Sequence, residues 1–148
     1  MTTVRSLLQK KGAQVFTVSP ETPVLEAMKA LSDHDIGALV VIENGQVCGI
    51  FTERDYARKI ILLGRASKNT TVRQVMSSPV VSVRPQQTLL ECMAMMSKRK
   101  IRYLPVIEGG EIKGILSIGD VLNAVIAEQG QALDRLEKAG RANDDFLI

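Results

Sequence analysis

Two short stretches of the sequence place a hydroxyl group and a carboxylate three residues apart, each directly after a run of apolar residues. The stretches are GIFTERD, which supplies Thr52 and Asp55, and GILSIGD, which supplies Ser117 and Asp120. In each, the apolar run predicts a strand and the polar residues predict the start of a helix, where free backbone N–H groups attract phosphate. A carboxylate can accept hydrogen bonds from the vicinal hydroxyls of a ribose. The two stretches therefore favour a pair of nucleotide sites.

The same spacing also fits a helix cap. In a capping box, a Ser or Thr side chain and an acidic side chain three residues later satisfy the first N–H groups of their own helix. Asp is one methylene shorter than the Glu that usually closes a capping box, and the pattern occurs at equivalent places in two repeats. Both observations favour a ligand-binding role in addition to the cap. Capping and ligand binding can coexist, so both interpretations stay open at Asp55 and Asp120.

An internal repeat relates the residues around the two stretches. When the sequence is shifted by 65 residues, positions 18–57 align with positions 83–122 without a gap, and 15 of the 40 aligned pairs are identical. The tetrapeptide TTVR also occurs twice, at 2–5 and at 70–73. A register kept over this length indicates two copies of one structural unit.

Each copy has the predicted element order β-α-β-β-α. The first helix is expected to start after Thr22, with Pro23 in its first turn, or after Thr88, which forms a capping box with Glu91. The other expected elements are a short first strand (14–18 or 80–83), a buried strand (38–42 or 103–107), an Asn-Gly or Gly-Gly hairpin turn, a returning strand (47–51 or 112–116) and a second helix (53–63, or from 118 onward).

Neither copy, at about 60 residues, can bury its sheet alone. We therefore expect an α+β fold in which two tandem repeats, residues 4–65 and 72–127, pack sheet to sheet about a pseudo-twofold axis. Residues 128–148 are expected to form a helical extension that ends in a frayed tail from Ala139.

Basic residues near the junctions are candidates for contacts with phosphate. Arg54 and Arg58 lie one helical turn apart in the first copy, and Arg102 ends a basic cluster that begins at Lys98. A solvated charged loop is the alternative for Lys98 and Arg99, whereas Arg102 directly precedes a buried strand. The aligned positions of the first copy carry two aspartates and a histidine instead. We therefore expect the two clefts to differ in affinity or in ligand.

The composition narrows the function classes. The 148 residues carry a formal net charge of +3 and only 3% aromatic residues, which together with the lack of a helix-turn-helix pattern argues against a nucleic-acid partner. No catalytic Ser/His/Asp set, Cys/His pair or metal cluster is visible, so we expect neither an enzyme nor a metal site. Without a secretory signal or a run of 18 apolar residues, we expect a cytoplasmic protein with no membrane contact and with reduced thiols at Cys48 and Cys92.

The tandem units, the hairpin glycines and the two Gly-apolar-apolar-Ser/Thr-x-x-Asp junctions resemble a pair of CBS domains, also called a Bateman module, over residues 4–127. The resemblance implies an adenine nucleotide as a regulatory ligand, AMP first and NAD or ATP as alternatives, and no catalytic cofactor. By position, the ribose would be held by Asp55 and Asp120, and the ribose or phosphates would lie near Thr52, Ser117, Arg54, Arg58 and Arg102. The adenine pocket would be lined by Val15, Gly37, Ala38, Leu39, Val80, Tyr103, Leu104 and Pro105.

The function that follows from the resemblance is that of an energy or metabolite sensor. Because the repeats occupy most of the chain, we expect the regulated protein to be a separate partner, and we expect a homodimer. The alternative is a homodimeric assembly module that needs no ligand, with the apolar helices at 56–63 and 121–126 as its contacts.

Overall fold

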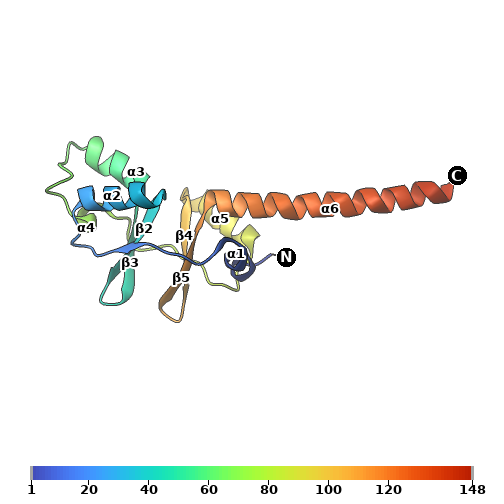
Figure 1. The fold of residues 1–148 in the computed structure, drawn as a ribbon, viewed down its shortest axis with the longest axis horizontal. Helices are drawn as coiled ribbons and strands as arrows, with labels where there is room; N and C mark the ends of the chain where they lie inside the picture. The colour runs from blue at the N-terminus through green and yellow to red at the C-terminus, as the bar shows by residue number, and fades with distance from the viewer. Residues whose placement is uncertain (1, 148) are drawn as a thin grey trace.

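The computed structural model describes residues 2–147, with the side chains of residues 2–140, and shows a body of two similar halves from which one helix projects (Figure 1). In chain order the elements are α1 (Val4–Lys11), β1 (Thr17–Val18), α2 (Val24–His34), β2 (Ala38–Glu43), β3 (Gln46–Thr52), α3 (Glu53–Asp55), the π-helical η1 (Tyr56–Ile61), α4 (Val72–Val75), α5 (Leu89–Arg99), β4 (Tyr103–Glu108), β5 (Glu111–Ser117) and α6 (Ile118–Leu147).

Two β-hairpins form the centre of the body and confirm the predicted turns. Strand β2 pairs antiparallel with β3, and β4 with β5. Both turn residues have positive φ, 53° at Asn44 and 78° at Gly45 in the first hairpin, and 61° at Gly109 and 80° at Gly110 in the second. This backbone matches the twist of the flanking strands, and it explains why Asn-Gly and Gly-Gly stand there. The hairpins lie side by side (Figure 1), with β3 and β5 in contact, so the α+β fold of two repeats with packed sheets is confirmed.

The first strand of each repeat is shorter than predicted. In the first half, β1 pairs parallel with β2, with Val18 opposite Val41. In the second half only the equivalent pair, Val83 and Val106, forms a bridge. Pro105 explains the difference: the N–H of the aligned Val40 donates to Phe16 O at 3.1 Å, and a proline has no N–H to give.

Helices α1 and α4, which the sequence pattern did not predict, are exchanged between the halves. Both begin in the TTVR tetrapeptides, and Thr3 and Thr71 are their N-caps. The N–H of Val4 donates to Gln87 O at 2.8 Å, in the second half, whereas the N–H of Val72 donates to Thr22 O at 2.9 Å, in the first half. Each repeat is therefore completed by the helix that precedes the other repeat.

The two hydrophobic cores show the same exchange. Val4, Leu7 and Leu8 of α1 are buried in the core that also contains Leu104 and Leu116, whereas Val72 and Val75 of α4 are buried in the core around Leu39 and Phe51. A Cβ on Gly114 would lie 2.7 Å from Leu8, and a Cβ on Gly49 would lie 2.5 Å from Met76. The repeated glycines thus leave room for the exchanged segments.

Two helix boundaries and one capping box differ from the predictions. Helix α2 has Pro23 rather than Thr22 as its N-cap, because the Thr22 hydroxyl lies 3.2 Å from Ser19 Oγ instead of capping the helix. At α5 the cap is Thr88 as predicted, but the Glu91 carboxylate accepts from Gln87 and does not close a box. The helix predicted to Leu63 ends at Ile61.

Helix α6 continues through the predicted tail. It reaches Leu147, and every side chain from 129 to 140 is exposed. Its first turns, with Val121 and Val125, are buried in the second half. The part that projects from the body is a single helix with no neighbour along its length (Figure 1).

Candidate functional site

Two clefts lie between the halves, and each combines parts of both repeats. The Asp55 cleft, of about 490 Å³, is formed by the β3–α3 junction, the segment 76–81 and the residues 99–103 of the second repeat. The Asp120 cleft, of about 520 Å³, is formed by the β5–α6 junction, the segment 11–16 and the residues 34–38 of the first repeat. The segments that follow the exchanged helices α4 and α1 therefore form one wall of each cleft.

The walls of the two clefts share an apolar part. Ile50, Val80 and Ile101 line the Asp55 cleft, and their repeat equivalents Ile115, Val15 and Ile36 line the Asp120 cleft. Three aliphatic side chains from three segments form a surface on which a flat heterocyclic base can lie.

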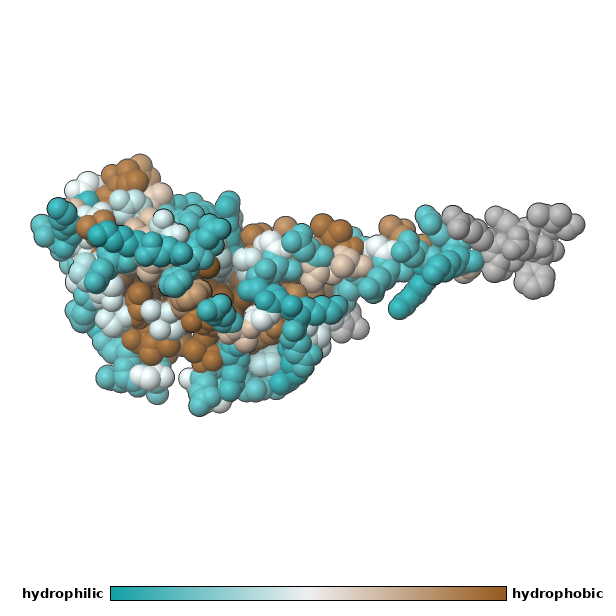
Figure 2. Space-filling model, in the orientation of Figure 1, coloured by the Kyte–Doolittle hydropathy of each residue, from teal (hydrophilic) through white to brown (hydrophobic). Residues whose placement is uncertain are grey.

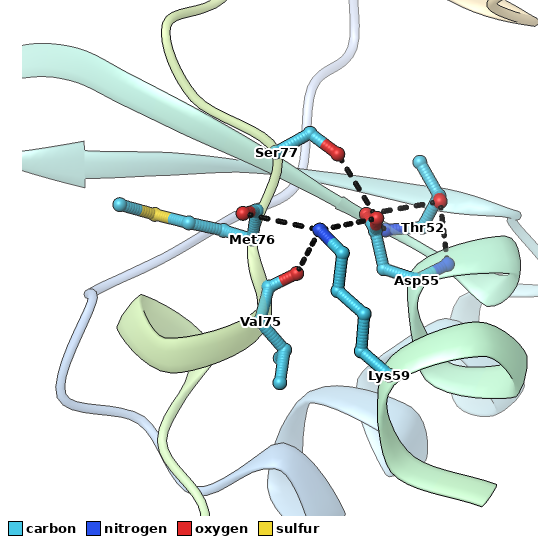
Figure 3. A network of polar contacts seen from close by, with 6 residues as sticks. All are labelled: Thr52, Asp55, Lys59, Val75, Met76 and Ser77. Carbon is cyan, nitrogen blue, oxygen red and sulfur yellow. Dashed lines mark hydrogen bonds and ion pairs between the residues drawn. The ribbon is translucent and has the colours of Figure 1, made fainter. Parts of the chain in front are cut away.

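Asp55 is buried, and both oxygens of its carboxylate contact groups of the protein itself (Figure 3). Its Oδ2 accepts from the N–H of Thr52 at 3.0 Å, and the Thr52 hydroxyl accepts from the N–H of Asp55 at 3.2 Å. Its Oδ1 accepts from the Ser77 hydroxyl at 2.9 Å and lies 3.2 Å from Lys59 Nζ. The capping interpretation thus holds at this junction, and the carboxylate also binds the segment after α4.

Asp120 is more accessible, with 27% of its side chain exposed against 9% for Asp55. Its Oδ2 accepts from the N–H of Ser117 at 2.9 Å and lies 3.0 Å from Lys11 Nζ. Oδ1 accepts no hydrogen bond from the described residues. Burial alone would raise the pKa of Asp120, but the Ser117 N–H and the Lys11 ammonium outweigh it and hold the pKa below its usual value.

The charges of the two clefts differ strongly. The Asp55 cleft is lined by a single acid, Asp55, and by six basic residues: Arg54, Arg58, Lys59, Arg99, Lys100 and Arg102. The Asp120 cleft is lined by one lysine, Lys11, and by two acids, Asp35 and Asp120. The basic cluster of the second repeat therefore faces the junction of the first repeat, an arrangement that the sequence could not reveal.

Tyr103 separates the two clefts, because it lines both of them. Its hydroxyl lies against Gly37, where an added Cβ would stand 2.0 Å from Oη. Burial raises the pKa of the phenol, and the nearby Glu53 adds to this, while Arg102 opposes it. Only glycine at position 37 leaves room for this contact.

The structure brings most of the predicted site residues into the clefts. The Asp55 cleft contains Thr52, Arg54, Asp55, Arg58, Val80, Arg102 and Tyr103, and the Asp120 cleft contains Val15, Gly37, Ala38, Tyr103, Ser117 and Asp120. The other three, Leu39, Leu104 and Pro105, are buried and line neither cleft. Leu39 and Leu104 belong instead to the cores of the two halves.

Several cleft residues were missed by sequence reasoning. Ser77 and Lys59 bind Asp55, and His34 lines the Asp120 cleft with its ring stacked on Phe16 at 3.7 Å between centroids. These residues carry no motif. A signal exists for Ser77, since it lies in the segment after the second TTVR tetrapeptide, and the segment after the first TTVR tetrapeptide lines the other cleft.

Comparisons with known proteins agree with this geometry. The CBS domain family model matches residues 4–62 and 72–127. The "CBS domain-containing protein CBSX3, mitochondrial" of Arabidopsis thaliana is 38% identical over 91% of this chain and 70% of its own. The structure of a protein with CBS domains from Burkholderia ambifaria MC40-6 has a TM-score of 0.83 at 44% identity, over 86% of this chain and 96% of that one. A hexameric CBS-CP12 protein from bloom-forming cyanobacteria has a TM-score of 0.69 at 29% identity, over 74% of this chain and 64% of that one.

Proposed function

The chain belongs to the CBS domain family, and from this premise we propose that it binds an adenine nucleotide between its halves and reports this binding to a partner protein. CBS pair proteins are generally regulatory modules that bind ligands or mediate assembly, and typically not enzymes. The proposed ligands are AMP first, then NAD or ATP. The regulatory unit would be the two repeats, 4–65 and 72–127, with the helical extension from 128.

The observation that carries this proposal is the carboxylate of Asp120 at the mouth of a partly apolar cleft. Its pKa is held low, so it is ionised at neutral pH, and its Oδ1 is open to accept hydrogen bonds from ribose hydroxyls. Val15, Ile36 and Ile115 beside it offer an apolar bed for the base. Asp55 can accept hydrogen bonds from a ribose in the same way only if a sugar hydroxyl displaces the Ser77 hydroxyl from Oδ1 of Asp55, or donates to that oxygen alongside it.

The architecture of the clefts explains how binding could be transmitted. Each cleft takes its junction from one repeat and its opposite wall from the other. A ligand that contacts both walls binds most tightly at one relative orientation of the halves, and so shifts the population towards that orientation. A partner that contacts both halves would detect the change.

Isothermal titration with AMP, NAD and ATP tests the proposal. We expect saturable binding that is weakened in Asp120→Asn, which removes the charge and keeps the shape. Asp134→Asn on α6 is the matched control, because Asp134 is exposed and lines neither cleft. If no adenine nucleotide binds the wild-type protein at millimolar concentration, the proposed ligand class is wrong.

The cytoplasmic location stays a prediction, since the Arabidopsis relative is named as mitochondrial. No helix among the described residues is long and apolar enough to cross a membrane. Fractionation of cells that express the tagged protein would locate it.

A second candidate function, homodimeric assembly, is favoured by an exposed apolar face (Figure 2). On α6 this face contains Ile118, Leu122, Ile126, Leu133 and Leu136, each at least 40% exposed. At 100° per residue these side chains fall within an arc of about 80°. Ile61 at the end of η1 is exposed as well, and so are Leu62 and Leu63 after it. A second copy of the chain would cover this face, and oligomers occur among the similar proteins, since the CBS-CP12 protein is hexameric.

Sedimentation or light scattering tests the assembly. Leu133→Glu with Leu136→Glu should convert an oligomer into a monomer, because two charges would be buried against the partner helix. Gln131→Glu with Lys138→Glu adds negative charge to the opposite side of α6 and should leave the oligomer intact. A wild-type protein that is monomeric at high concentration would exclude this function.

A further inference from the structure

We propose that the Asp55 cleft is a polyphosphate site, which selects a nucleoside di- or triphosphate over a monophosphate, and that the Asp120 cleft does not accept this class of ligand. The inference rests on the proposed function, since it specifies which class of nucleotide binds in one of the protein's two clefts. It follows from charge, from the ion pairs already formed and from the position of the basic residues on both walls.

The first step is the excess of positive charge. Of the six basic residues that line the Asp55 cleft, only Lys59 forms an ion pair among the described residues, with Asp55 itself. The other five basic residues form no ion pair with the described residues. They are Arg54, Arg58, Arg99, Lys100 and Arg102. Cations gathered around one cleft repel each other and attract anions.

The second step is the state of the single acid. The Asp55 carboxylate is buried, lies 3.2 Å from Lys59 Nζ and accepts from Thr52 and Ser77 (Figure 3). Its negative charge is therefore neutralised inside the wall and does not cancel the five free cations. A ligand that enters the cleft meets a positive surface.

The third step is the position of these cations on opposite walls. Arg54 and Arg58 come from the junction helix of the first repeat, whereas Arg99, Lys100 and Arg102 come from the end of α5 and the loop that follows it. Arg54 Nη1 lies 3.5 Å from the carbonyl oxygen of Lys100, so the walls are within reach of one side chain. A single phosphate group contacts two or three such cations, whereas a chain of phosphates between the walls can engage all of them.

The Asp120 cleft provides the contrast inside the same molecule. Its only lysine, Lys11, is held by Asp120 at 3.0 Å, and Asp35 adds a second negative charge. A polyphosphate in this cleft would meet two acids and no free cation. Adenosine or a monophosphate fits this environment better. AMP, the first of the proposed ligands, would then occupy the Asp120 cleft, and a di- or triphosphate would occupy the Asp55 cleft.

Titration of the full chain with adenosine, AMP, ADP and ATP in EDTA tests the assignment. We expect the affinity to rise along the series, by about tenfold or more from AMP to ATP, because each added phosphate gains charge-assisted hydrogen bonds. Raising the salt concentration should weaken the binding of ATP much more than the binding of adenosine. In Arg58→Gln with Arg102→Gln, ATP should bind no more tightly than AMP, while adenosine affinity is unchanged.

A control variant locates the effect. Lys29→Gln with Arg84→Gln removes two exposed cations that line neither cleft and should leave the preference for ATP intact. If AMP binds and ATP binds no more tightly to the wild-type protein, this assignment is wrong and the proposed function stands. If neither adenosine nor any nucleotide binds, both are wrong.

Discussion

The side-chain nitrogen of Lys59 lies 3.2 Å from Oδ1 of Asp55 and donates to the backbone carbonyl of Val75 at 2.9 Å. One lysine thus links the end of α3 to the end of α4, two segments that meet only because α4 packs on the first half. Asp55 is buried, so a lost partner leaves its carboxylate desolvated with one contact fewer.

Replacement of Lys59 with Met should therefore destabilise the protein. We expect the free energy of unfolding to fall by about 1 kcal/mol, a modest loss because the Lys59 side chain is itself 37% exposed and water screens its ion pair. Urea unfolding measures the change. Lys29→Met, at an exposed position of α2, should have little effect, and equal losses in the two variants would contradict a structural role of the ion pair.

The contact between Gly37 and Tyr103 predicts a substitution that can be rescued. Gly37→Ala should lower the free energy of unfolding by about 1–3 kcal/mol, since its Cβ would lie 2.0 Å from Tyr103 Oη. Tyr103→Phe removes that oxygen, so the double variant should recover part of the loss. Gly130→Ala, with no atom within 4 Å of the new Cβ, should stabilise α6 slightly. A double variant no more stable than Gly37→Ala would show that the oxygen is not the cause.

The exchange of α1 predicts that an N-terminal substitution destabilises the second half. Leu7→Ala should cost about 2–4 kcal/mol, because Leu7 is 7% exposed within the core of that half. Amide hydrogen exchange should accelerate in β4 and β5 more than in β2 and β3. Leu90→Ala, at a position of α5 that is 52% exposed, should be nearly neutral. Faster exchange confined to the first half would refute the exchanged packing.

The lowered pKa of Asp120 predicts a dependence on pH. The ionised carboxylate is favoured in the folded state, so its stabilising effect is complete above the ordinary pKa of the unfolded chain. The effect is lost as the pH falls through the lower folded-state pKa. Asp120→Asn should therefore lower the thermal midpoint at neutral pH, and the difference from wild type should shrink in acid. Asp134→Asn serves as the control, and a difference that persists unchanged at low pH would contradict this account.

The features that the sequence predicted are those set by neighbouring residues or by the repeat. Asn44 and Gly45 specify a tight hairpin turn whatever surrounds them, and the polar residues after β3 and β5 mark the same junction twice. The candidate site could be located for this reason, because its hydroxyl and carboxylate belong to one local motif.

The features that could not be predicted depend on contacts between distant segments. Nothing in the local sequence of Val4–Lys11 says on which half this helix packs, and nothing near Arg102 says that it faces the junction of the other repeat. Leu39 and Leu104 were expected in the adenine pocket because the resemblance to CBS domains implies that this strand lines it. Their side chains lie in the two cores instead, since alternate residues of a strand point to opposite faces.

The exchange of α1 and α4 also has a consequence for the origin of the molecule. A single repeat cut from this chain would keep the helix that fits the other core, and would lack its own. Two identical copies of such a repeat could complete each other by lending their leading helices, as in a domain-swapped dimer. Gene duplication and fusion would preserve every one of those contacts. Fusion would also free the two copies to differ, which allows one cleft to become basic while its twin remains acidic.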